Sequence, residues 1–451
     1  MRTINSWLVL LMAACWGMFA VPASAGEFRA AAGKVDITPQ PGVDLWGYSD
    51  RTGAADGVLD PLYAKTLVLD DGSKRIAIVT LDLGRTFGRE ALELVRSRVK
   101  ASVKVDAVFF TASHTHSGPV IDDSYPDGKR PAWETTALDK IGSAIEKAAG
   151  ELSTARIGTG AGETFIGHNR RLVQADGTVK MLWRNMSKDP TQPLDGHVGV
   201  IRVDAASHAP LAILVNYSCH PVVLGPDNLR YSADYVGAMA GRVEKHFGDD
   251  AVCLFLQGGA GDINPYYDKM KLQEDGVRLM QETGQQLGDE VIRIAGDVRP
   301  TAPEHPSLEF RVDLHHFESR WDVEQVLAAL KARLSSDILK RYRKYLESPL
   351  DCDVMTLLIN DEIALTGMPG EPFVEFATSF RSRSPVRHAF FVGYANGYRG
   401  YFPTIKAAVV GGYGANSFVA RAQVGAGEAM LNQSIVRLYE MRGQLTAVPP
   451  Q

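Results

Sequence analysis

The segment TASHTHSGP, residues 111–119, places two histidines one residue apart, directly before a Ser-Gly-Pro turn. In an extended backbone, side chains at positions i and i+2 project to the same side of the chain. We therefore expect His114 and His116 to face one site. Because an isolated H-x-H in a loop is also compatible with an incidental pair, the choice between a metal site and a plain loop depends on what accompanies it.

Four further apolar runs of strand length also end in turns marked by Gly or Pro that carry polar groups. These runs lead to His220, to the segment GGAGDINP, to Glu371, and to Tyr398 with Tyr401. A catalytic zinc ion typically takes about three protein ligands and keeps a position for water, whose pKa it lowers toward about 7. The donors are dispersed along the chain, and it contains no short motif such as H-E-x-x-H.

Each of these groups also has a structural interpretation. His220 can be a strand-end histidine, Glu371 can be a first-turn helix acid favoured by the helix dipole, and Tyr398 and Tyr401 can be packing aromatics. His315–His316 lie within an apolar run, point to opposite faces and precede no acidic cluster, which indicates a structural role. The same role is predicted for the scattered histidines His168, His197, His208, His246, His305 and His388.

Apolar runs of strand length alternate with amphipathic runs of helix length. Strands are expected at 75–83, 106–113, 210–218, 250–257 and 387–396, and helices at 89–101, 136–150 and 321–347. This alternation predicts an α/β fold of mixed β-sheets flanked by helices, with the metal site in loops at strand ends. The proline-rich stretch 296–310 is a candidate linker between two lobes.

The composition is that of a soluble enzyme. The 451 residues are 45% hydrophobic and 22% charged, with a net charge of −5. This is enough apolar material for a core, and the mild acidity argues against a nucleic-acid partner, which would need a basic face. After the N-terminal segment, no stretch reaches the roughly 18 apolar residues that a transmembrane helix needs.

The N-terminus has the pattern of a secretory signal peptide over residues 1–25. Arg2 precedes the apolar run WLVLLMAACWGMFAV, and the small residues ASA end at Ala25. We expect cleavage near Ala25 and export to the periplasm or the medium; the alternative, lipidation at Cys15, would leave an apolar stretch behind. The three remaining cysteines, an odd number that does not suggest a disulfide framework, are Cys219, Cys253 and Cys352.

The segments SHTHSGP, NYSCHPVVLG, YSADYVG, GAGDINP, PGE and ANGYRGY occur in this order, and with them the sequence resembles the neutral/alkaline ceramidases. The resemblance extends from GKVDITPQPG at residue 33 to about residue 440. That family consists of secreted zinc amidases that cleave the N-acyl bond of ceramide. The resemblance therefore implies that residues 26–451 form a catalytic domain that binds one zinc ion and a small-molecule or lipid N-acyl substrate, with peripheral membrane contact in the lipid case.

The resemblance also implies roles for individual residues. The implied zinc ligands are His114, His220, Glu371 and Tyr401. The implied substrate-facing groups are His116, Arg170 in the segment GHNRR, and Tyr413. Since Glu371 and Tyr401 follow the stretch 296–310 and the histidines precede it, the two lobes are expected to share one site.

Two features depart from the family pattern. The family's Gly-Asp-Val-Ser-Pro is GDINP here, so Asn264 replaces a serine of the catalytic machinery. An amide can still donate a hydrogen bond to an oxyanion, and zinc-activated water would then attack the substrate. We also expect this protein to lack the C-terminal immunoglobulin-like domain that such enzymes usually carry.

The sequence thus predicts an exported zinc-dependent hydrolase that cleaves an amide bond of an N-acylated compound, which is ceramide-like or another. Two alternatives stay open. One is an ester or lactone hydrolase on the same scaffold, because the same groups serve either carbonyl. The other is a degenerate member that binds a lipid or sugar without turnover; the missing serine favours it, and the retained ligand set opposes it.

Overall fold

The computed structural model describes residues 27–122, 129–248, 250–332, 334 and 336–446. The predicted signal peptide lies outside the described residues. Within those ranges, no helix is both long enough and apolar enough to cross a membrane. The three cysteines of the described chain are free and buried, so no disulfide links them.

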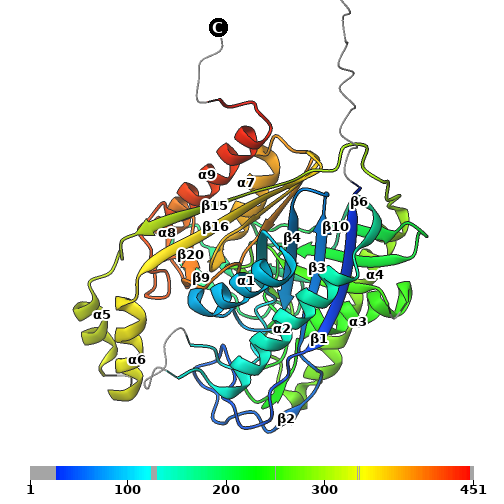
Figure 1. The fold of residues 1–451 in the computed structure, drawn as a ribbon. Helices are drawn as coiled ribbons and strands as arrows, with labels where there is room; N and C mark the ends of the chain where they lie inside the picture. Colours follow the sequence, from blue (N-terminus) through cyan, green and yellow to red (C-terminus); the bar gives the residue numbers. More distant parts are fainter. Residues whose placement is uncertain (1–26, 123–128, 249, 333, 335, 447–451) are drawn as a thin grey trace, which may run out of the picture.

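The larger of two mixed β-sheets has eight strands (Figure 1). Its strands are β1 (Arg29–Asp36), β3 (Tyr63–Asp70), β4 (Arg75–Leu81), β5 (Ala107–Ala112), β6 (Ser153–Glu163), β10 (His197–Ala205), β11 (Pro210–Tyr217) and β13 (Val252–Gln257). They are arranged in the order β13-β11-β10-β6-β1-β3-β4-β5. The outer pairs β11–β13 and β4–β5 are parallel and the inner pairs are antiparallel, which confirms the expected mixed sheet.

The second sheet has four strands and packs face to face on the first. Its strands are β15 (Leu308–Phe317), β16 (Leu350–Ile359), β17 (Ile363–Gly367) and β19 (His388–Val392), in that order. Phe109 and Leu214 of the large sheet share one apolar core with Leu365 and Phe390 of the small sheet. Because this core is continuous across both sheets, removing its apolar surface from water stabilises the two sheets together.

Helices cover the outer face of each sheet, which gives four layers. On the large sheet these are α1 (Arg89–Val103), α2 (Ala132–Gly150), α3 (Tyr235–Phe247) and α4 (Gly276–Asp297). On the small sheet they are α7 (Val374–Arg383) and α9 (Ala426–Met441). The α1 stripe of Leu92, Val95 and Val99 is buried as its spacing predicts. The α/β class is therefore confirmed.

Two expected elements differ in the structure. The predicted helix 321–347 is divided into α5 (Val323–Leu330) and α6 (Ser336–Glu347). The second helix begins within the run Leu-Ser-Ser-Asp, residues 334–337, and Ser and Asp favour helix N-termini because their side chains compete for backbone groups. The stretch 296–310 also contains the end of α4 and the start of β15, so only residues 298–307 connect them.

The segment after β19 forms backbone hydrogen bonds with β13 and β5, the two edge strands of the large sheet. The amide of Gly393 donates to the carbonyl of Gln257 at the end of β13, with an N···O distance of 2.8 Å. The amide of Asn396 donates to the carbonyl of Phe110 in β5 at 3.0 Å. Since β13 also contacts β5 directly, the loops that follow these distant strands meet at one place.

Candidate active site

Two histidines at this meeting point are anchored by backbone carbonyls. His114 follows β5, and its Nδ1 lies 2.5 Å from the carbonyl oxygen of Gly84. His220 follows β11, and its Nδ1 lies 2.6 Å from the carbonyl oxygen of Ala260. A carbonyl can only accept, so each Nδ1 carries the proton and each Nε2 keeps a free lone pair. This is the arrangement of a histidine prepared to bind a metal.

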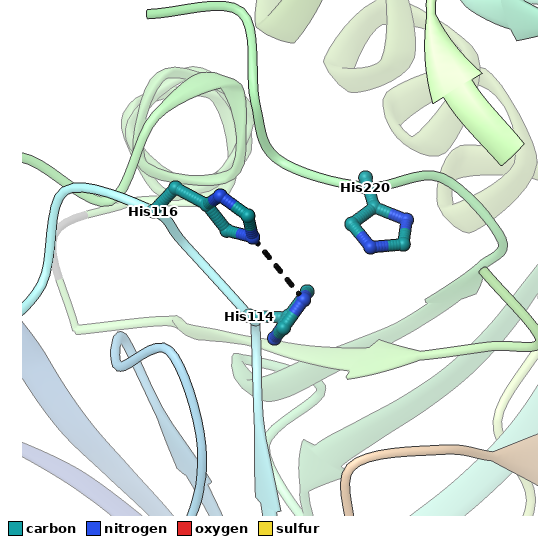
Figure 2. Close-up of side chains that lie close together, drawn as sticks. All are labelled: His114, His116 and His220. Atoms are coloured by element: carbon teal, nitrogen blue, oxygen red, sulfur yellow. Dashed lines mark hydrogen bonds between the residues drawn. The ribbon is translucent and has the colours of Figure 1, made fainter. Parts of the chain in front are cut away.

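The free nitrogens converge on one another and on a carboxylate. Ligand atoms of His114, His116 and His220 all lie within 4.8 Å of one another (Figure 2). The Oε2 atom of Glu371 is 3.0 Å from Nε2 of His220 and 3.3 Å from Nε2 of His114. Two imidazole nitrogens and a carboxylate form a donor set that fits a catalytic zinc ion.

Burial and neighbouring groups shift the pKa values of His220 and Glu371 in the direction that metal binding needs. Burial lowers the pKa of His220 to about 4, which favours the neutral imidazole. Burial alone would raise the pKa of Glu371, but His114 and His220 hold it well below its ordinary value. An ionised carboxylate therefore faces the two imidazole rings in a site where His114 and Glu371 are at most 2% exposed.

His116 shares the site for a reason other than the one the sequence suggested. Its Nε2 lies 3.3 Å from Nε2 of His114. However, the backbone at His114 is not extended: its φ is 71°, in the left-handed region that non-glycine residues rarely adopt. The extended-backbone argument was therefore wrong in its geometry, and this local turn brings the two rings together. His116 also packs over Gly47, where an added Cβ would lie 2.3 Å from its Cγ.

The two tyrosines of the ANGYRGY segment contact different partners. Glu371 lies in β18 (Glu371–Pro372), which pairs with β20 (Tyr401–Phe402). The hydroxyl of Tyr398 donates to Oε1 of Glu371 at 2.5 Å. The hydroxyl of Tyr401 instead accepts from Arg170 at 3.1 Å, and burial raises its pKa well above the ordinary value. The sequence offered packing as one interpretation of Tyr398, and spacing alone could not show which tyrosine reaches Glu371.

Arg170 and Asn264 form the neighbouring part of the site. Asn264 lies in β14 (Ile263–Pro265), which pairs with β7 (Gly167–Asn169) directly before Arg170. One guanidinium nitrogen of Arg170 donates to Oδ1 of Asn264 at 3.0 Å, and another donates to the carbonyl of Gly261 at 2.7 Å. Arg170 is 3% exposed and Asn264 is 1% exposed, so the short β7–β14 ladder fixes both side chains in the interior.

The side of the site around Arg170 reaches the surface through two aromatic residues. Tyr413 is 38% exposed and Trp183 is 36% exposed, and their ring centroids are 5.6 Å apart. The guanidinium carbon of Arg170 lies 5.2 Å from the Tyr413 ring centroid. His315–His316 lie in β15, where the exposed ring of His316 pairs with Asp351.

Comparisons with known proteins agree with this arrangement. The family model described as neutral/alkaline non-lysosomal ceramidase, N-terminal, matches residues 28–285. The chain belongs to this family. The neutral ceramidase of Pseudomonas aeruginosa is 28% identical over 328 residues, which cover 65% of this chain and 47% of that enzyme. The aligned region thus spans about half the length of the Pseudomonas enzyme.

Solved structures share the fold. The crystal structure of neutral ceramidase from Pseudomonas aeruginosa superimposes with a TM-score of 0.72 and 19% identity, covering 94% of this chain and 76% of that one. A structure of a ceramidase complexed with C2 gives a TM-score of 0.71, also at 19% identity, covering 94% and 77%. At this identity, the similarity establishes that the new family member has the ceramidase fold.

Several residues that contact the site were not predicted from the sequence. The carbonyls of Gly84 and Ala260 orient the histidines, and the ring of Tyr394 lies 4.3 Å from the ring of His114, centroid to centroid. Asp268 accepts a hydrogen bond from Asn264. The backbone carbonyls have no signature in the sequence, whereas Asp268, four residues after Asn264, could have been noticed as an acid close to the altered motif.

Proposed function

We propose that this protein is a zinc-dependent hydrolase that cleaves the amide bond of an N-acylated, ceramide-like substrate. The observation that carries the proposal is the geometry of His114 and His220. Each Nδ1 is bound to a backbone carbonyl, and Nε2 of each lies 3.0 to 3.3 Å from Glu371. Membership of the neutral/alkaline ceramidase family supports the same chemistry.

In this proposal His114, His220 and Glu371 hold the zinc ion, and Tyr401 is the fourth ligand. A bound zinc ion lowers the pKa of water and polarises a carbonyl group. The hydrogen bond from Tyr398 fixes the orientation of the Glu371 carboxylate, a task typical of the groups that surround metal ligands.

His116 is proposed as the general base rather than a ligand. Burial, and then the nearby His114 and His220, lower its pKa well below the ordinary value, so the ring is neutral and able to accept a proton. Its Nδ1 has no hydrogen-bond partner among the described residues, in contrast to the anchored His114 and His220. The ring would take a proton from the attacking water and return it to the leaving nitrogen.

Arg170, Asn264 and Tyr413 are proposed to bind the negative charge that develops on the substrate carbonyl. Arg170 brings a buried positive charge, and Tyr413 lies beside it at the exposed side of the site. One N–H of Asn264 is bound to Asp268, which leaves the second to donate to an oxyanion. An amide cannot form the covalent acyl intermediate that a serine could, so the proposal has water as the nucleophile.

The test uses purified full-length protein, measured for zinc content and for turnover of matched N-acyl and O-acyl substrates. We expect about one zinc per chain, hydrolysis of a short-acyl ceramide, loss of turnover with a chelator and recovery with added zinc. Faster cleavage of the O-acyl partner would favour the ester hydrolase. Full zinc without any turnover would favour a binding protein.

Export belongs to the proposal as well. Its basis is the signal-peptide pattern that ends at Ala25. The N-terminal sequence of protein recovered from the periplasm or the medium tests it, and we expect the chain to begin at Gly26. Protein retained in the cytoplasm with Met1 intact would contradict export.

A further inference from the structure

The carboxylate of Asp268 lies next to the catalytic motif and is fully buried. Its exposed fraction is 0%, and its Oδ2 accepts a hydrogen bond from Nδ2 of Asn264 at 2.9 Å. Its Oδ1 has no partner among the described residues. The ammonium group of Lys269 lies 3.7 Å from Oδ2. A buried carboxylate with one unpaired oxygen costs free energy, so its presence calls for a role.

Asn264 connects this carboxylate to a guanidinium group. Its Nδ2 donates to Asp268, and its Oδ1 accepts from Arg170 at 3.0 Å. If the amide were flipped, its N–H groups would face the Arg170 donors and its oxygen would face the carboxylate, so both contacts would become repulsive. Asp268 and Arg170 together therefore impose one orientation on the amide.

The same connection continues toward the proposed metal site. Arg170 donates to the hydroxyl of Tyr401 at 3.1 Å and to the carbonyl of Gly261 at 2.7 Å. Side-chain contacts thus run without a break from Asp268 through Asn264 and Arg170 to Tyr401. Hydrogen bonds in such a buried chain polarise one another, so a change at one end reaches the other.

We propose that Asp268 is a positioning residue for the hydrolysis: through Asn264 it holds Arg170 in the orientation that binds the substrate carbonyl. This inference rests on the proposed function. Asp268 is not among the proposed zinc ligands. The inference requires that one of the two residues donates the hydrogen bond and the other accepts it.

The amide and the carboxylate can be exchanged between positions 264 and 268 by mutation. Asn264→Asp removes the oxyanion donor and also places two carboxylates against each other, so turnover should fall by more than the about 10²- to 10³-fold expected from the lost donor alone. Asp268→Asn keeps an oxygen acceptor for Asn264 and should lose less. In the double variant N264D/D268N, the new carboxylate accepts from Arg170 and from the new amide, so kcat should recover about 10- to 100-fold relative to N264D, the range found when a supporting partner is restored, while the loss of the Asn264 oxyanion donor remains.

Zinc content, melting temperature, kcat and KM are measured for wild type, both single variants and the double variant. Asp189→Asn is the matched control, because Asp189 is exposed and, among the described residues, its hydrogen bonds go to the Ser187 side chain and, through its backbone, to Asn185. We expect wild-type kinetics for this control and unchanged zinc in every variant. Recovery of both melting temperature and kcat in the double variant supports the proposal.

Three results overturn it. If the double variant recovers neither quantity, the contact is absent in solution. If melting temperature recovers while kcat is equal in all folded variants, the pair is structural only. If wild type hydrolyses no N-acyl substrate, the proposed function fails and the catalytic role fails with it, while the melting temperatures still report whether the contact exists.

Discussion

The two parts of the candidate site are held in place by different kinds of group. His114 and His220 are anchored by the backbone carbonyls of Gly84 and Ala260 at strand-end loops. The guanidinium of Arg170 contacts the carbonyl of Gly261 and, in addition, the side chains of Asn264 and Tyr401. A backbone carbonyl survives substitution of its own residue's side chain, whereas a side-chain partner does not. The orientation of the two histidines should therefore be less sensitive to substitution of neighbouring side chains than the orientation of Arg170.

The largest effect is expected for the metal-donor part. His114→Ala removes a nitrogen whose free lone pair faces Glu371, so the variant should lose both zinc and turnover. Elemental analysis and activity measure this, with His316→Ala as a control because that exposed histidine lies in β15 and pairs with Asp351. Full zinc in His114→Ala would remove this residue from the ligand set.

His116→Ala separates the unanchored histidine from the two anchored ones. Its ring lacks a partner at Nδ1, so the variant should keep its zinc and lose about 10²- to 10⁴-fold in turnover, the range for a general base. Zinc analysis and kinetics on the same preparation check this. Loss of the metal would instead place His116 among the ligands.

Asn264→Ala tests the part that side chains hold. Losing an oxyanion donor typically lowers the rate by about 10²- to 10³-fold, and we expect that loss with zinc retained. Turnover on a short-acyl ceramide and elemental analysis measure it. Turnover close to that of wild type would make Asn264 structural and leave carbonyl binding to Arg170 or Tyr413.

The smallest effect is a dependence of stability on pH. Burial raises the pKa of Asp268 to about 6, from about 3.9 in the unfolded chain. The folded state thus binds this proton more tightly, so the contribution is fully present below about pH 4 and is lost as pH rises through 6. Relative to Asp268→Asn, wild type should lose up to about 3 kcal/mol between pH 4 and 7.5 in urea unfolding. Parallel pH profiles would contradict the assignment.

The local sequence was enough to predict the fold class and the family of this protein. Strand-length apolar runs that end in polar turns predicted the α/β class, and the ordered motifs from SHTHSGP to ANGYRGY predicted the family; both are confirmed. These signals are readable because burial of alternating strands and helices depends on the types of neighbouring residues. The strand-end pattern also offered His114, His116, His220 and Glu371 as candidate donors, and the family resemblance then implied a ligand set without His116.

Only the tertiary structure decided how those donors meet. The left-handed backbone at His114, the contact of Tyr398 with Glu371, and the pairing of Asn264 with Arg170 have no reliable signal in local sequence. Each depends on where the ends of β5, β11, β13 and β19 come together, which is set by the packing of two sheets on one core. Contacts between residues far apart in the chain follow from that packing, and residue types alone do not determine it.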